Sequence, residues 1–198
     1  MELVSKVTAL FSDIDKKVAE FQLKSGLRCS KMCGACCPAA KVQTTILEML
    51  PAAQEILRRD AVAYWLDRIS NQTPSNRCVF YQTQPAPEAS GHCEFYPWRP
   101  SVCRLFGYAA VRTRQGKSAL AVCKQLKQTA PDDVVAAMAL EIEAPCFTWY
   151  GTQICGLDPV LGTKLFPINM ALSHAVERMG LQMHLAYHER LVISDTAA

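Results

Sequence analysis

The chain has 198 residues, of which 50% are hydrophobic and 20% are charged, which is ordinary for a soluble globular protein. A chain of this length and composition does not need disulfides to fold. A formal net charge of +3 is too mild to indicate nucleic-acid binding. We therefore expect a single domain over residues 1–198, with nucleic acid an unlikely partner.

The N-terminal segment lacks the features of an export signal. Glu2 stands where a signal peptide carries positive charge, and Ser5, Lys6 and Ser12 break the apolar run. No stretch approaches the roughly 18 uninterrupted apolar residues of a membrane span. We expect a cytoplasmic protein with no membrane partner, in which thiols stay reduced.

Helical periodicity opens the chain. Apolar residues recur at intervals of three and four over residues 3–24, and Gly26 suits the end of this helix. Residues 44–69 also predict helix. Because proline is tolerated in a first turn, Pro51 predicts the start of a new helix within this range.

The middle of the chain predicts little regular structure. Residues 71–103 hold five prolines, which favours irregular backbone shaped around ligands. Residues 106–123 partly alternate between apolar and polar side chains, which indicates a small β-hairpin. The C-terminal part over residues 131–192 predicts two helices: one over 131–143 that begins at Pro131, and a long final helix over 167–193 with Gly180 as the expected point of interruption. The predicted fold is mainly α, a helical domain around a loop-rich cysteine site.

Cysteine provides the main chemistry of this sequence, and eight of the ten cysteines fall between residues 29 and 123. Four of them are crowded into CSKMCGACC, where Gly34 predicts a loop. Thiolates are soft ligands that suit zinc and iron–sulfur clusters, and closely spaced loop cysteines can direct their sulfurs onto one centre. We expect the metal ligands to be Cys29, Cys33, Cys36, Cys37, Cys78, Cys93, Cys103 and Cys123.

Other side chains are weaker candidates. A buried cysteine with no ligand is common, and we expect this structural role for Cys146 and Cys155. His92 is a candidate accessory ligand or proton donor because a predicted ligand follows it directly. His184 and His188 share one helix face, but they lack the adjacent glutamate of the metalloprotease pattern, so surface or packing roles fit them better.

Three motifs occur in order along the middle of the chain: CSKMCGACC, CVFY from Cys78, and CEFYPWRPSVCRLF from Cys93 to Phe106. Together they resemble the YkgJ-type cysteine-cluster proteins, the CxxCxxCC family described as chelating zinc or iron. The resemblance covers residues 29–123, with one departure: three residues, rather than two, separate Cys29 from Cys33. It implies metal chelation. One related group, the flagellin lysine methylases, is thought to carry an iron–sulfur cluster.

The C-x3-C-x2-C spacing of Cys29, Cys33 and Cys36 also resembles the cluster motif of radical S-adenosylmethionine enzymes. Those enzymes carry an aromatic residue where this chain has Ala35. They also need a βα barrel, and no alternating βα units are predicted here. Three spaced cysteines alone are therefore a weak signal for that family.

A basic stretch surrounds the later cysteines. No Asp or Glu occurs from Phe95 to Pro131, whereas seven Lys and Arg residues do. A zinc ion with four thiolates, or an oxidised four-iron cluster, carries a charge of about −2, which nearby cations would offset. Arg99 and Arg104 are the candidates for contacting the ligated cofactor from outside the ligand set. Alternatively, the stretch over 99–127 docks an acidic protein partner or is an ordinary solvated face.

Aromatic residues alternate with the predicted ligands. Such rings exclude water from a cluster and tune its potential, or they form the core of the proline-rich segment. The residues are Phe80, Tyr81, Phe95, Tyr96, Trp98, Phe106 and Tyr108.

The sequence therefore predicts metal binding through cysteine thiolates, with an iron–sulfur cluster, of the 4Fe-4S type, as the first choice and zinc as the alternative. Three roles remain open: a redox or modification enzyme whose cluster has an open coordination position, an electron-transfer or accessory subunit, and a zinc-stapled interaction module without catalysis. The sequence names no catalytic residue.

Overall fold

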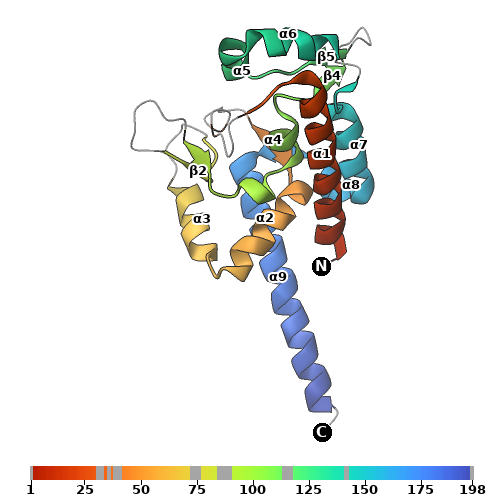
Figure 1. Cartoon of the computed structure of the whole chain (residues 1–198). Helices are drawn as coiled ribbons and strands as arrows, with labels where there is room; N and C mark the ends of the chain where they lie inside the picture. Colours follow the sequence, from red (N-terminus) through yellow and green to blue (C-terminus); the bar gives the residue numbers. More distant parts are fainter. Residues whose placement is uncertain are drawn as a thin grey trace.

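Helices dominate the molecule, and short pairs of strands join them (Figure 1). The predicted mainly α fold is confirmed. None of the described helices combines the length and apolar character needed to cross a membrane. The computed structural model describes residues 2–29, 34, 37, 42–71, 77–83, 91–112, 118–140 and 143–196, with side chains up to 187.

The first helix, α1 (Glu2–Ser25), forms one wall of the molecule. Its buried side chains recur every three or four residues, so they lie on one stripe. They are Val4, Val7, Phe11, Ile14, Val18 and Phe21. The helix ends before Gly26, whose φ of +74° lies in the left-handed region that glycine favours. The predicted helix and its end are both confirmed.

The predicted helix over 44–69 is two helices, α2 (Ile46–Arg58) and α3 (Val62–Ser70). The expectation that Pro51 begins a helix is wrong, because Pro51 lies inside α2. A capping box starts α2 instead: the Glu48 N–H donates to the Thr45 hydroxyl at 3.3 Å, and the Glu48 side chain accepts from the Thr45 backbone.

Three antiparallel pairs contain all of the described strands. The pairs are β1 (Gln43–Thr45) with β6 (Leu165–Pro167), β2 (Tyr81–Gln82) with β3 (His92–Cys93), and β4 (Ala110–Arg112) with β5 (Ser118–Leu120). The β4–β5 pair confirms the predicted hairpin. The described residues between 71 and 103 hold more regular structure than expected: β2, β3, a 3-10 turn η1 (Tyr96–Trp98) and the start of α4 (Ser101–Leu105).

The C-terminal half is helical, as predicted. Its helices are α5 (Lys124–Thr129), α6 (Pro131–Ala139), α7 (Phe147–Leu157), α8 (Pro159–Gly162) and α9 (Ile168–Thr196). The expected start at Pro131 is confirmed, whereas α7 and α8 were not predicted. The expected interruption at Gly180 is wrong, because α9 continues through it and extends beyond the body of the molecule (Figure 1).

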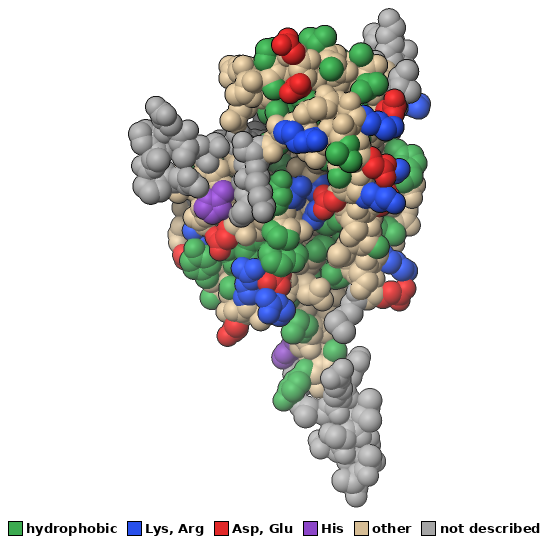
Figure 2. Space-filling model, in the orientation of Figure 1, with side chains coloured by type: hydrophobic (Ala, Val, Ile, Leu, Met, Phe, Trp, Pro, Cys, Tyr) green, Lys and Arg blue, Asp and Glu red, His purple; other side chains and the backbone are tan. Residues whose placement is uncertain are grey.

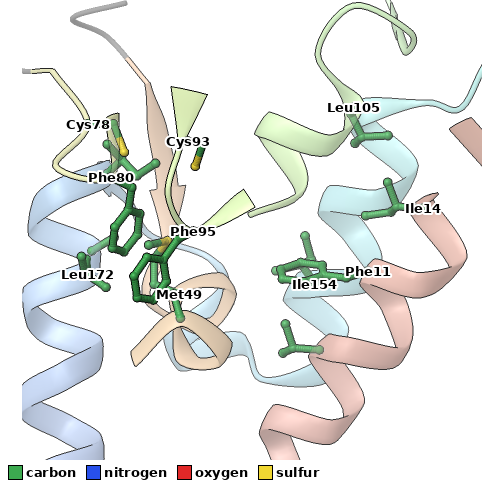
Figure 3. Close-up of a cluster of buried hydrophobic side chains, with 14 of the residues drawn as sticks. Phe11, Ile14, Met49, Cys78, Phe80, Cys93, Phe95, Leu105, Ile154 and Leu172 are labelled. Carbon is green, nitrogen blue, oxygen red and sulfur yellow. The ribbon is translucent and has the colours of Figure 1, made fainter. Parts of the chain in front are cut away.

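The core brings these elements together around aromatic rings. α9 packs against α2, and α1 packs against α4 and α7. Phe80 and Phe95 stack with ring centroids 4.2 Å apart, and Trp65 meets both rings edge-on. Cys78 and Cys93 lie at one end of this ring stack (Figure 3). Phe80 and Phe95 of the predicted aromatic set therefore form core, and the core ends at two of the predicted ligands.

Candidate metal centre

A cavity of about 340 Å³ contains most of the predicted ligands. Its walls come from α1, the loop after α1, the β2–β3 region, α4 and the start of α5. Two predicted ligands, Cys33 and Cys36, lie outside the described residues. The other six all line this one cavity: Cys29, Cys37, Cys78, Cys93, Cys103 and Cys123.

Local structure fixes the positions of the later cysteines. Cys93 pairs with Tyr81 across the β2–β3 ladder, and the Tyr81 N–H donates to the Cys78 carbonyl at 3.1 Å. Cys103 lies on α4, about one turn after Pro100, the N-cap residue of this helix. Cys123 caps α5, where its sulfur accepts the Leu126 N–H at 3.3 Å. Four cysteines far apart in sequence thus line one cavity.

A close backbone contact seats the cysteine block against β3. The Gly34 N–H donates to the Gly91 carbonyl at 2.9 Å, and the Cys37 N–H donates to the Gly34 carbonyl at 2.9 Å. A Cβ atom at Gly34 would lie 2.3 Å from the Gly91 oxygen. Glycine is therefore required at residue 34, because any side chain would push the block away from the strand.

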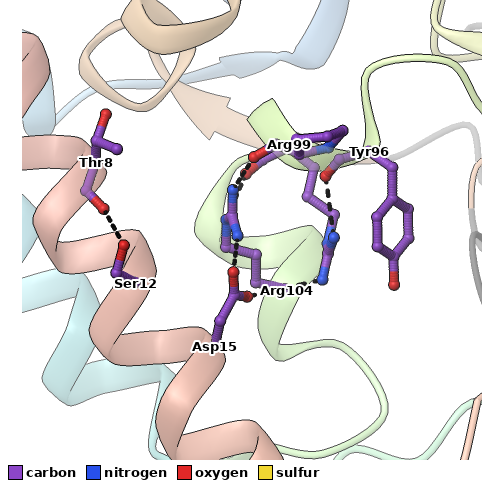
Figure 4. Close-up of polar contacts among 7 residues, drawn as sticks. Thr8, Ser12, Asp15, Tyr96, Arg99 and Arg104 are labelled. Carbon is purple, nitrogen blue, oxygen red and sulfur yellow. Dashed lines mark hydrogen bonds and ion pairs between the residues drawn. The ribbon is translucent and has the colours of Figure 1, made fainter.

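Arg104 is a buried cation at the edge of the cavity (Figure 4). It pairs with Asp15 of α1, donates from Nε to the Arg99 carbonyl at 2.8 Å and donates from Nη2 to the Pro97 carbonyl. Burial lowers the pKa of Arg104, while the Asp15 charge opposes that effect. All three nitrogens have protein partners, so this side chain ties α1 to the η1–α4 turn.

Arg99 is held differently. Its Nη1 donates to the Tyr96 carbonyl at 3.0 Å, and its guanidinium lies 3.7 Å from the centroid of the Tyr96 ring. Its Nη2 is 3.8 Å from Asp15, while its buried Nε has no hydrogen-bond partner among the described residues. With Arg104 and Asp15, the wall has two guanidinium groups and one carboxylate, a net charge of +1 beside the thiols.

Tyr108 contributes a second donor to the wall. Its side chain is buried, and its hydroxyl has no hydrogen-bond partner in the described part of the chain. Burial, followed by the charge of Cys29, raises the pKa of Tyr108 to about 12, although the Gln22 side chain and the Cys29 backbone lie near enough to oppose that rise. The hydroxyl therefore stays protonated near neutral pH.

The other described cations of the basic stretch do not line the cavity. Arg112, Lys124 and Lys127 are exposed, while Arg114 and Lys117 lie outside the described residues. Figure 2 shows Lys and Arg interspersed with Asp and Glu on the visible face. Of the described Lys and Arg residues in this stretch, only Arg99 and Arg104 line the cavity.

The weaker histidine and cysteine candidates lie elsewhere. His92, Cys146 and Cys155 do not line the cavity, and the Cys155 sulfur lies 3.2 Å from a threonine hydroxyl. His184 is exposed on α9, and the side chain of His188 lies outside the described part.

The six described cysteines surround the cavity without meeting at one point. Within the described ranges, no three His, Cys, Asp or Glu side chains are close enough to hold a metal ion. The donor set nonetheless fits a thiolate-bound cofactor, since soft sulfur atoms, two cations and two unpartnered donors share this space.

Sequence reasoning missed the contribution of α1. Asp15, Val18 and Gln22 form a stripe along one face of the helix and line the cavity. The sequence does contain a signal for this face, because the polar residues Asp15 and Gln22 are seven positions apart, next to the apolar stripe of the helix. Asp15 is 89 residues away from its partner Arg104 in sequence, so the pattern alone did not indicate that partner.

Comparison with known proteins agrees with this geometry. Residues 28–133, just over half of the chain, match the family described as "CxxCxxCC: Putative zinc- or iron-chelating domain". No curated protein and no solved structure matches the chain. The match includes all eight predicted ligands and ends before Cys146. A metal cofactor is thus supported, and the chain belongs to the CxxCxxCC family of zinc- or iron-chelating domains.

Proposed function

We propose that this protein holds an iron–sulfur cluster of the 4Fe-4S type in the cysteine cavity. The observation that carries the proposal is that six cysteines surround one cavity of about 340 Å³. A single zinc ion draws four ligands to about 2.3 Å from itself, which needs sulfurs that converge. The six cysteines that line the cavity exceed the four ligands of one zinc ion, which favours a larger group.

The proposed ligands come from both halves of the motif. Cys33 and Cys36 belong to the same crowded block as two cavity residues, and so they complete the candidate set. Each ligand adds negative charge, and the net +1 of the Asp15, Arg99 and Arg104 group offsets part of it. The remaining candidate ligands are Cys29, Cys37, Cys78, Cys93, Cys103 and Cys123.

Access to the cavity supports a redox or modification role. Cys29 is exposed, and the Phe106 side chain at the cavity is 40% exposed. A cluster there is within reach of a small substrate or an electron-transfer partner. A purely structural site is normally closed by four protein ligands.

Structural zinc is the second candidate. The two-residue strands β2 and β3 are too short to be stable alone, and a metal could staple them to the cysteine block. In that case the protein is an interaction module without catalysis.

We further propose a reducing compartment, the cytoplasm, because a cavity lined with thiols keeps its ligand set only there. Exposed Arg112, Lys124 and Lys127 support an acidic protein partner on the stretch over 99–127, with no role for nucleic acid.

Single cysteine substitutions test the proposal. Cys93→Ser and Cys103→Ser should lower iron and acid-labile sulfide per chain at least about twofold in anaerobically purified protein, since each removes a cluster ligand. Cys155→Ser is the matched control, because this cysteine lies outside both the cavity and the family match. Iron and sulfide that stay unchanged in both variants would contradict the ligand assignment. Zinc without sulfide would select the structural candidate.

A further inference from the structure

Two buried polar atoms of the cavity wall have no hydrogen-bond partner among the described residues. They are Arg99 Nε and Tyr108 Oη, and both residues line the cysteine cavity. Most buried polar groups in proteins are hydrogen-bonded, and leaving one unsatisfied is unfavourable. Both residues line the cavity, so these two donors are available to a group that it binds.

Arg104 also lines the cavity, but each of its guanidinium nitrogens has a hydrogen-bond acceptor. Its three nitrogens donate to Asp15 and to the carbonyls of Arg99 and Pro97, and its guanidinium lies 4.5 Å from the centroid of the Phe11 ring. In Arg99, by contrast, the Tyr96 carbonyl and ring fix the plane of the guanidinium and leave Nε without a partner.

Tyr108 follows the C-terminal end of α4, and backbone hydrogen bonds fix its position. Its backbone N–H donates to the Leu105 carbonyl at 3.0 Å, and the preceding Gly107 N–H donates to the Ala121 carbonyl at 3.0 Å. The ring is buried, with 6% of the residue exposed, so the hydroxyl cannot turn to solvent. Cys29 lies within electrostatic range of this hydroxyl.

We propose that Arg99 Nε and Tyr108 Oη donate hydrogen bonds to sulfur atoms of the bound metal centre and raise the reduction potential of the cluster. The inference rests on the proposed function. Hydrogen bonds to sulfur and nearby positive charge stabilise the more negative, reduced cluster. The two side chains are positioning residues, because they act through the ligands and the cofactor. Arg104 does not share this role, because its donors are already occupied.

The test compares Tyr108→Phe and Arg99→Gln with the parent, as anaerobically purified holoprotein, after iron and sulfide have been quantified. Each variant should lower the ratio of reduced to oxidised cluster at a fixed potential about tenfold, a shift of about 59 mV for a one-electron couple. Tyr150→Phe is the matched control, because this buried tyrosine donates to Asp13 at 2.9 Å and lies outside the cavity. The reduction potential of the cluster should not change in this variant.

Unchanged potentials in both variants, with iron content intact, would overturn the inference. If Arg99→Gln lowers the metal content, Arg99→Lys replaces it, because lysine keeps the charge and loses the fixed Nε donor. If the parent contains zinc and no sulfide, the iron–sulfur proposal fails separately. In that case, Tyr108→Phe and Arg99→Gln should release zinc at a higher pH than the parent, because the thiolates lose stabilising donors. An identical release profile would overturn the inference for zinc as well.

Discussion

The Ser101 backbone N–H donates a 3.0 Å hydrogen bond to the Glu48 carboxylate, and this contact fixes the start of α4, the helix that carries Cys103. The same buried carboxylate accepts from the Thr44 hydroxyl at 3.0 Å and from the Thr45 hydroxyl at 2.9 Å. One side chain therefore joins the capping box of α2 to the segment that presents a predicted ligand.

Replacing Glu48 should loosen this junction. In Glu48→Gln, the amide brings its own N–H groups to face the surrounding donors, so we expect the free energy of unfolding to fall by about 1–3 kcal/mol. Metal content should fall as well, because α4 loses its anchor. Urea unfolding and metal analysis measure the two effects. Glu177→Gln, on the exposed side of α9, should change stability by less than about 0.5 kcal/mol. Equal stability of the two variants would refute the role of Glu48.

Arg104→Lys tests whether geometry or charge matters at this buried position. Lysine keeps the charge but cannot reproduce the planar set of donors to Asp15, Arg99 and Pro97. We expect unfolding free energy to fall by about 2 kcal/mol, since at least one buried carbonyl loses its donor. Arg112→Lys, on an exposed position of β4, is the matched control. If both variants unfold at the same urea concentration, the charge alone accounts for Arg104.

Glu55 gives the fold a defined acid dependence. Hydrogen bonds from Arg58, and then from Arg59, lower the pKa of Glu55 from 4.5 to about 2 against the opposing effect of burial. Because the folded pKa lies below the unfolded value, the carboxylate contributes stability above the unfolded pKa and loses that contribution as the pH falls toward about 2. The stability difference between the parent and Glu55→Gln should therefore shrink between about pH 6 and about pH 3.

Urea unfolding of both proteins at each pH measures this difference. Loss of metal in acid affects the parent and Glu55→Gln alike, so the comparison isolates the carboxylate. A difference that stays constant across this range would show that the Arg58 and Arg59 pairs do not shift the pKa in the folded protein.

Gly34→Ala should damage the metal site through the backbone. Its Cβ would lie 2.3 Å from the Gly91 carbonyl oxygen, so the cysteine block must separate from β3. We expect metal content to fall at least about twofold, because the ligands on the block and on the strand no longer face one cavity. Gly151→Ala, in α7 with nothing within 4 Å, should instead keep its metal and gain up to about 1 kcal/mol of stability. Full metal content in Gly34→Ala would disprove the close contact.

The sequence predicted α1, the β4–β5 hairpin and α6 because local periodicity, alternation and capping residues agree with the fold there. The expected helix start at Pro51 is wrong because the T-x-x-E sequence of Thr45 and Glu48 forms a capping box that starts the helix before the proline. α7 was missed because its composition, FTWYGTQICGL, is rich in aromatic, β-branched and glycine residues that disfavour helix. α7 is helical because its buried side chains pack against α1, which outweighs the unfavourable local propensity.

The cysteine ligands of the candidate site could be predicted from the sequence, but the other residues that form or support the cavity wall could not. Cysteine spacing in one segment indicates ligands, and six of the eight predicted ligands line one cavity. Asp15 and Glu48 could not be assigned, because their partners Arg104 and Ser101 are distant in sequence and the contacts exist only after α1, α2 and α4 pack. The sequence also did not separate the occupied donors of Arg104 from the unpartnered Nε of Arg99.

The measurement that tests the central claim most directly is the iron, zinc and acid-labile sulfide content of anaerobically purified protein, with its visible absorption spectrum. The account predicts iron and sulfide in matching amounts and a broad band near about 400 nm that bleaches on reduction. Colourless protein with one or two zinc ions per chain and no sulfide would contradict it.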